Sequence, residues 1–172
     1  VGTHLLTFWN GSRQPFRLMG VGLAGYEELQ EGLAVLSEYL TGGLDSKRLR
    51  VLAGRVIAAR SLTDGAVFLD SFRLLYKSYG FDAHSAFLIA SRVHRAGGLT
   101  KDAIYLRGFL SVIEFLKKNG PFDVLWMGKI ALSHVLLIQD LLRRGLLSGP
   151  CFSPRYLDRP ESIEKLSHLR AC

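Results

Sequence analysis

Leucine residues recur at helical spacing in the segment Tyr26–Leu40, and this spacing is the feature that most restricts the possible folds. Leu29, Leu33, Leu36 and Leu40 are separated by four, three and four residues, so they share one face of a helix. Similar stripes follow along the chain with Gly or Pro between them, and no run alternates with the period of a strand. The sequence therefore predicts an all-α fold, a single helical domain of about seven helices.

Start and stop signals set the bounds of several further helices. Asp45 and Asp82 are suited to cap helices at their N-termini, and Gly97 with Gly98 is expected to end the helix that Asp82 begins. The apolar residues between 123 and 144 predict one long helix, and residues 161–169 predict a short final one. We expect residues 11–25, which are rich in glycine, to form a loop.

Composition and charge exclude several classes of protein. Of the 172 residues, 48% are hydrophobic and 22% are charged, which is typical of a globular chain. The net charge of +7 is spread over the whole sequence, and no helix-turn-helix, zinc-finger or RNP pattern supports nucleic-acid binding. Two cysteines are too few for a disulfide framework, so we expect a cytoplasmic protein. The longest apolar stretch, residues 124–142, contains charged residues, so we expect no membrane span.

General catalytic motifs give little guidance. The chain has five histidines, but it lacks HExxH, a Ser-His-Asp spacing and a CxxC pair. Judged by such motifs alone, it is a helical domain of unknown function.

Several longer stretches are more specific. VGTHLLTFWNG at residues 1–11, QPFRL at 14–18, GLAGYEELQEGLAVLSEYLTGGL at 22–44 and RVHRAGGLTKDAIYLRGF at 92–109 resemble the bacterial flavohemoglobin expression-modulating QEGLA motif proteins. That family is similar to the microtubule tyrosine carboxypeptidases, which are zinc metallopeptidases. In the family, His-Glu directly precedes VGTH and forms an HExxxH motif, whereas this chain starts at Val1.

The resemblance implies a set of metal ligands. They are the histidine of the His-Glu dipeptide, His4, and Glu31 of QEGLA, and the glutamate of the dipeptide is the general base. Glu31 and Glu38 are seven residues apart and share a helix face, so Glu38 is either a supporting residue or a solvent-exposed charge. Residues 1–172 are thus expected to be the C-terminal helical part of a metallopeptidase-like catalytic domain that begins inside the HExxxH motif. With two of three ligands and no base, this fragment should be inactive and should bind Zn weakly or not at all.

A carboxypeptidase also needs a cation for the terminal carboxylate of its substrate and a donor for the oxyanion. Tyr105 is our candidate for the oxyanion or water-orienting donor, and Arg95 or Lys101 for holding the carboxylate. Lys101 and Tyr105 are four residues apart and so share a helix face. The alternative is that Arg95 and Lys101 serve helix ends and that Tyr105 packs in the core.

Two functions follow from these observations. The first is a zinc-dependent peptidase of carboxypeptidase type, which acts on a peptide or protein C-terminus. The alternative is a non-enzymatic helical interaction or regulatory domain whose basic surface binds an acidic protein segment or nucleic acid. The residue pair before Val1 would distinguish them, because His-Glu completes the metal site.

Overall fold

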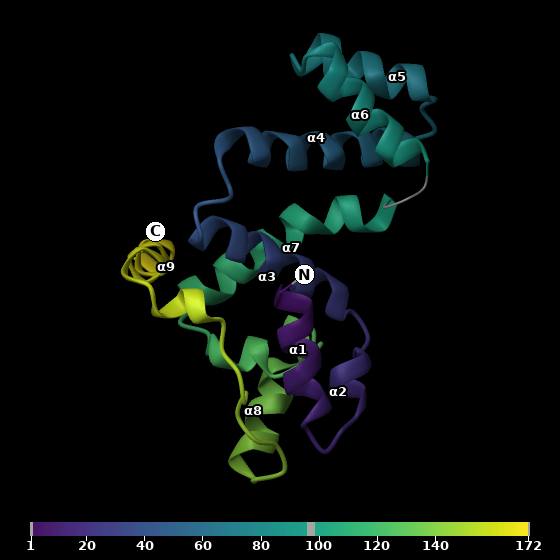
Figure 1. Ribbon diagram of the computed structural model, residues 1–172. Helices are drawn as coiled ribbons and strands as arrows, with labels where there is room; N and C mark the ends of the chain where they lie inside the picture. The colour runs from purple at the N-terminus through teal and green to yellow at the C-terminus, as the bar shows by residue number, and fades with distance from the viewer. Residues whose placement is uncertain (1, 96–98, 172) are drawn as a thin grey trace. The chain divides into compact units, whose positions relative to one another are not determined.

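The computed structural model describes residues 2–95 and 99–171, and their regular structure is entirely helical (Figure 1). No strand occurs in these residues, so the expected all-α fold is confirmed. The described part of the chain contains nine α-helices joined by short 3-10 and π-helical segments. The chain divides into two compact units, of which unit 1 comprises Val1–Gly43 and Arg107–Cys172, and unit 2 comprises Leu44–Leu106. None of the described helices is long and apolar enough to cross a membrane.

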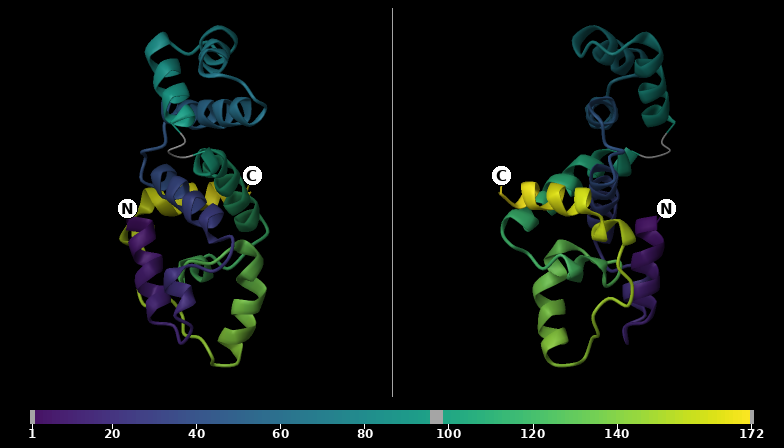
Figure 2. Two further views of the ribbon diagram at one scale, coloured as in Figure 1. Left: turned by 90° about the vertical axis from the view of Figure 1, so that its right-hand side faces the viewer. Right: turned by 60° about the vertical axis from the view of Figure 1, so that its left-hand side comes forward.

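Unit 1 is built around helix α3. Its helices are α1 (Gly2–Ser12), α2 (Leu18–Val21), α3 (Tyr26–Leu40), α8 (Val135–Arg143), α9 (Pro160–Ala171) and the second part of α7 (Leu99–Lys117). The views in Figures 1 and 2 show α1 and α3 side by side, and α3 contacts both α1 and α9. The bounds of α3 are those that the leucine spacing predicts.

The core of unit 1 includes the leucine stripe of α3 and apolar residues of the segment 124–130. All four leucines of the stripe are at most 2% exposed. Trp126, Met127 and Ile130 of unit 1 are equally buried. Burying each of the four leucine side chains stabilises the fold by about 1.5–3 kcal/mol. This packing holds α3, and the polar residues on its remaining faces, in a fixed position.

The prediction of one helix over residues 123–144 is wrong. The segment forms two short 3-10 helices, Asp123–Trp126 and Leu132–His134, before α8 begins. Between them the backbone pairs with another segment, because Lys129 N donates to Met19 O at 2.7 Å and Lys129 O accepts from Leu23 N at 2.9 Å. A regular helix would use these groups internally. The continuous apolar run therefore reflects burial on several sides rather than one helical stripe.

The prediction of a loop over residues 11–25 is also corrected. α1 continues through Gly11 and Ser12, and the short helix α2 lies inside the segment. At Gly11 any side chain would collide with the backbone of Met19. The glycine thus allows α2 to pack closely against α1. The sequence alone predicted a loop because the segment is rich in glycine.

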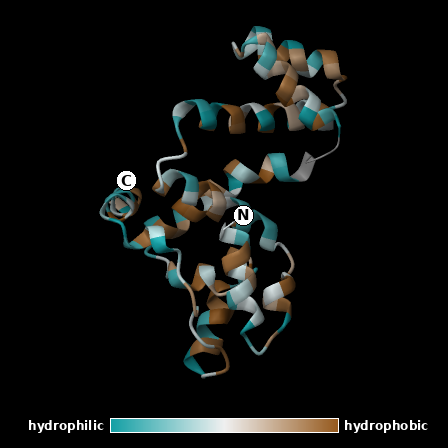
Figure 3. Cartoon of the chain, in the orientation of Figure 1, coloured by the Kyte–Doolittle hydropathy of each residue, from teal (hydrophilic) through white to brown (hydrophobic). Residues whose placement is uncertain are grey.

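Unit 2 contains α4 (Ser46–Thr63), α5 (Phe68–Arg73), a π-helical turn (Leu74–Ser78), α6 (Ala83–His94) and the first part of α7. The two predicted N-caps are confirmed, since Asp45 accepts from Arg48 N at 2.6 Å and Asp82 from Ser85 N at 2.9 Å. Hydrophobic and hydrophilic residues alternate along these helices (Figure 3). The hydrophobic ones form a separate core of Ala58, Ala59, Leu75, Phe81, Ala86, Ile89 and Val93. The predicted end at Gly97 and Gly98 lies outside the described residues.

Candidate functional site

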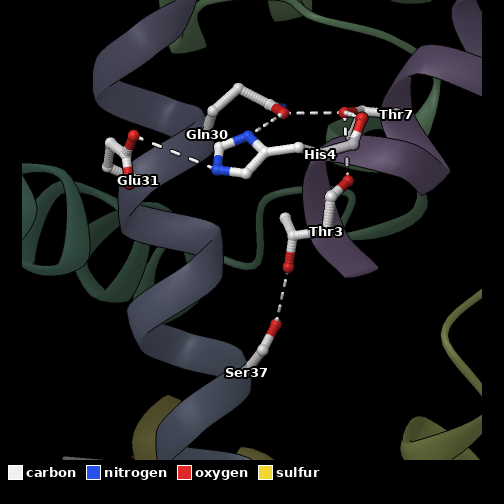
Figure 4. Close-up of polar contacts among 6 residues, drawn as sticks. All are labelled: Thr3, His4, Thr7, Gln30, Glu31 and Ser37. Carbon is white, nitrogen blue, oxygen red and sulfur yellow. Dashed lines mark hydrogen bonds and ion pairs between the residues drawn. The ribbon is translucent and has the colours of Figure 1, made fainter. Parts of the chain in front are cut away.

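A row of polar side chains joins α1 to α3 in unit 1 (Figure 4). Helical spacing places Thr3 and Thr7 on one face of α1, with His4 beside them. Thr7 is fully buried, and its hydroxyl donates to Gln30 Oε1 at 2.7 Å. At the other end of the row, Thr3 Oγ1 lies 3.3 Å from Ser37 Oγ. These contacts fix how α1 and α3 face each other around His4.

The His4 imidazole points from α1 toward two consecutive residues of α3 (Figure 4). Its Nδ1 lies 3.3 Å from Gln30 Oε1, and its Nε2 lies 3.9 Å from Glu31 Oε1. The Glu31 side chain is 8% exposed, whereas the His4 side chain is 40% exposed. The structure thus brings together the two residues expected to bind a metal ion, one of them buried and the other open to solvent.

Gln30 determines which imidazole nitrogen faces Glu31. An amide oxygen only accepts hydrogen bonds, so His4 Nδ1 donates to Gln30 Oε1 and Nε2 is the nitrogen that faces Glu31. Gln30 is 1% exposed, and its Nε2 has no hydrogen-bond partner among the described residues. The amide is therefore oriented by the contacts of its oxygen with Thr7 and His4. Metal-binding histidines are typically held by their second nitrogen in this way.

The His4–Glu31 pair fits zinc in its chemistry and its spacing. Imidazole nitrogen and carboxylate oxygen both bind zinc at about 2.0–2.2 Å, so two such donors around a tetrahedral ion lie about 3.3 Å apart. The observed separation of 3.9 Å is close to this distance. Within residues 2–95 and 99–171, no group of three or more His, Cys, Asp or Glu side chains is arranged to hold a metal ion. A complete zinc site thus needs at least one further ligand besides this pair.

Comparison with known protein families identifies the family of this chain. The family model for microtubule-associated tyrosine carboxypeptidase matches residues 1–171. The chain belongs to this family. The matched region includes both His4 and Glu31, and the expected similarity to the tyrosine carboxypeptidases is confirmed. No curated protein and no solved structure was found to match the chain.

Membership of the tyrosine carboxypeptidase family indicates the general chemistry. It places the chain among carboxypeptidase-like peptidases, and it indicates a peptide or protein as the class of substrate.

The other three candidate residues of this family member belong to unit 2. Arg95 is the exposed C-cap of α6, where its backbone N–H reaches Ser91 O. Lys101 is exposed in the first turns of α7, and Tyr105 is half-buried one turn later. His4 and Glu31 lie in unit 1, so the roles of Arg95, Lys101 and Tyr105 in catalysis stay predictions.

A cavity of about 410 Å³ opens along the seam that α1 and α3 form in unit 1. Thr3 lines it next to His4 in the chain, and Ser37 and Tyr156 line it together with Trp126. Tyr156 OH lies 2.6 Å from Ser37 Oγ, which itself donates to Leu33 O at 2.7 Å. Burial raises the pKa of Tyr156, and its hydrogen bond with Ser37 opposes this in part. The cavity therefore offers hydroxyl groups and the carboxylate of Glu38 beside apolar walls.

Sequence reasoning did not identify Gln30 and Thr7 as parts of the site. Their positions carry a weak signal, because Thr7 is one turn beyond Thr3 on α1 and Gln30 directly precedes Glu31. Both are polar residues with at most 1% exposure, and a polar residue that is buried needs a partner. Burial became visible only with the structure.

Proposed function

We propose that this chain forms part of the catalytic centre of a zinc-dependent carboxypeptidase that acts on the C-terminus of a peptide or protein. In this proposal His4 Nε2 and the Glu31 carboxylate hold the zinc ion. The observation that supports it most directly is the 3.9 Å approach of these two atoms from different helices. Family membership supports the carboxypeptidase chemistry.

The third ligand and the general base come, in this proposal, from a His-Glu dipeptide directly before Val1, as the resemblance to the HExxxH peptidases implies. Bound zinc would lower the pKa of a coordinated water and polarise the scissile carbonyl. The glutamate of the dipeptide would accept a proton from the attacking water.

The residues of this chain have supporting tasks. Gln30 accepts the Nδ1–H of His4 and keeps Nε2 directed at Glu31. Thr7 holds the Gln30 oxygen from the opposite side. We assign Tyr105 to oxyanion stabilisation and Arg95 or Lys101 to the substrate carboxylate, because a carboxypeptidase requires a donor and a cation for these two anionic groups.

Zinc content and peptidase activity of the full-length protein test this proposal. The activity readout is release of the C-terminal tyrosine from a peptide, followed by mass spectrometry. We expect Glu31→Gln to lose both bound zinc and activity, because the neutral amide is a poor zinc ligand. Glu27→Gln is the matched control, since Glu27 is an exposed glutamate on the same helix. It should retain both.

Two results would contradict the proposal. Full zinc occupancy in Glu31→Gln would show that Glu31 is not a ligand. Peptide cleavage that survives removal of zinc by a chelator would show that the reaction does not depend on the metal.

A further inference from the structure

Unit 2 concentrates positive charge where α4, α6 and α7 meet. The Asp102 carboxylate of α7 is completely buried, and Arg92 of α6 donates to it through Nε at 2.9 and 3.2 Å to the two oxygens. Arg55 of α4 lies in the electrostatic field of both residues. One buried carboxylate thus faces two guanidinium groups, which leaves an excess of positive charge.

Arg55 carries the uncompensated part of this charge. Its Nε is buried and has no hydrogen-bond partner among the described residues. Burial lowers the pKa of Arg55, and the nearby positive charge of Arg92 lowers it further. A buried donor without a partner and a cation beside another cation are both costly to a folded protein. A bound anion would offset the repulsion between the two guanidinium groups.

A cavity of about 240 Å³ lies at these two arginines. Arg55 and Arg92 supply its charge, and the aliphatic side chains of Val51, Leu88 and Ile89 supply most of the remaining wall. The volume is below the roughly 300 Å³ at which pockets for drug-sized ligands begin. The lining therefore suits a small molecule with an anionic group and an apolar body.

We propose that this cavity binds a small organic carboxylate. Its carboxylate group lies between the guanidinium groups of Arg55 and Arg92, which both line the cavity. Its branched aliphatic body lies against Val51, Leu88 and Ile89. Arginine is suited to this task, because its planar fork of donors matches a carboxylate.

Three probes in low-chloride buffer separate the parts of this proposal, with binding measured by isothermal titration calorimetry. They are 4-methylpentanoate, the neutral 4-methylpentanamide and inorganic phosphate. We expect the carboxylate to bind at least tenfold more tightly than the amide, because only the carboxylate balances the charge. It should also bind more tightly than phosphate, because phosphate has no apolar body. Equal affinity for the carboxylate and either other probe would overturn the proposal.

Variants test the assigned residues. Arg55→Gln should weaken 4-methylpentanoate binding at least tenfold, and the Tm of the ligand-free variant should be unchanged or higher, because repulsion with Arg92 is removed. Arg60→Gln is the matched control, since Arg60 lies on the same helix with 83% of its side chain exposed, and it should bind normally. A lower Tm with unchanged affinity in Arg55→Gln would assign Arg55 a purely structural role.

A second variant keeps the test valid if Arg55→Gln folds poorly. Leu88 lines the cavity and is 52% exposed, so Leu88→Asp should fold while its carboxylate repels an anionic ligand. We expect at least a tenfold loss of 4-methylpentanoate affinity. Unchanged affinity in a folded Leu88→Asp variant would contradict the location of the site.

Discussion

The backbone of Gly32 in α3 lies directly against the backbone of Gly108 in α7. A side chain on Gly32 would collide with the Gly108 carbonyl, and one on Gly108 would collide with the carbonyl of Glu28. Beside this contact, Arg107 Nε donates to the Glu28 carboxylate at 2.7 Å. The two glycines therefore set the position of α3 in unit 1, and Glu31 directly precedes one of them.

Gly108→Ala should destabilise the protein because the new methyl group has no space. Overpacking typically costs about 1–3 kcal/mol, which exceeds the gain of about 1 kcal/mol in helix propensity from Gly to Ala. The free energy of unfolding from urea denaturation measures the difference. Gly2→Ala is the control, because no atom lies within 4 Å of the added group. A Gly108→Ala protein as stable as the wild type would show that the helices can separate without cost.

Gln30→Leu tests whether Gln30 orients His4. The substitution removes the acceptor for His4 Nδ1–H, and it also removes a buried amide nitrogen that has no partner among the described residues. We expect the zinc affinity of the full-length protein to fall about 10- to 100-fold, as for other partners of metal-binding histidines. The Tm should change little. Unaltered zinc affinity would mean that the imidazole is held by other contacts.

The sequence predicts a helix best where a single apolar stripe lies between clear helix start and stop signals. The bounds of α3 agree with the prediction because its leucines face one core and Gly42 and Gly43 follow it. The same reasoning fails at residues 123–144, because Trp126, Met127 and Ile130 are buried on several sides. Such an apolar run has no helical period. Its length was the only feature that suggested one long helix.

The site was predictable in part for a similar reason. The resemblance to known peptidases named His4 and Glu31, and the structure places them close together. The role of Gln30 was not predictable, because its contact with His4 joins residues 26 positions apart in the sequence. No local pattern records such a contact. The same holds for Tyr156 and Ser37, which lie 119 positions apart.

Tyr156 should make the stability of the protein depend on pH above about 10. Burial raises the pKa of Tyr156 in the folded state, so the folded protein retains this proton at pH values where the unfolded chain, with a pKa near 10, has lost it. The stabilising effect is complete below pH 10 and is lost as the pH rises through the folded-state pKa. Tyr156→Phe should cost about 1 kcal/mol at pH 8 through the lost hydrogen bond to Ser37.

The Tm of both proteins between pH 8 and 11 checks this prediction. The wild-type Tm should fall more steeply above pH 10, so the difference between the two should shrink. The other five of the six tyrosines are common to both proteins, so their titration cancels. Parallel Tm curves over the whole range would contradict the assignment.

Asp102→Asn should strongly destabilise unit 2. The substitution keeps the shape of the side chain, but it leaves the charges of Arg92 and Arg55 without their buried counter-ion. Removing one partner of a buried ion pair costs about 3–5 kcal/mol, and the 40% exposure of the Arg92 side chain favours the lower end of this range.

Urea denaturation measures the loss of stability in Asp102→Asn. The control is Asp64→Asn, because Asp64 is 69% exposed beside Arg60 and should contribute less than about 1 kcal/mol. Added 4-methylpentanoate should restore more stability to Asp102→Asn than to the wild type, since the cavity then has a larger excess of positive charge. Equal losses in the two variants would show that Asp102 does not neutralise this cluster.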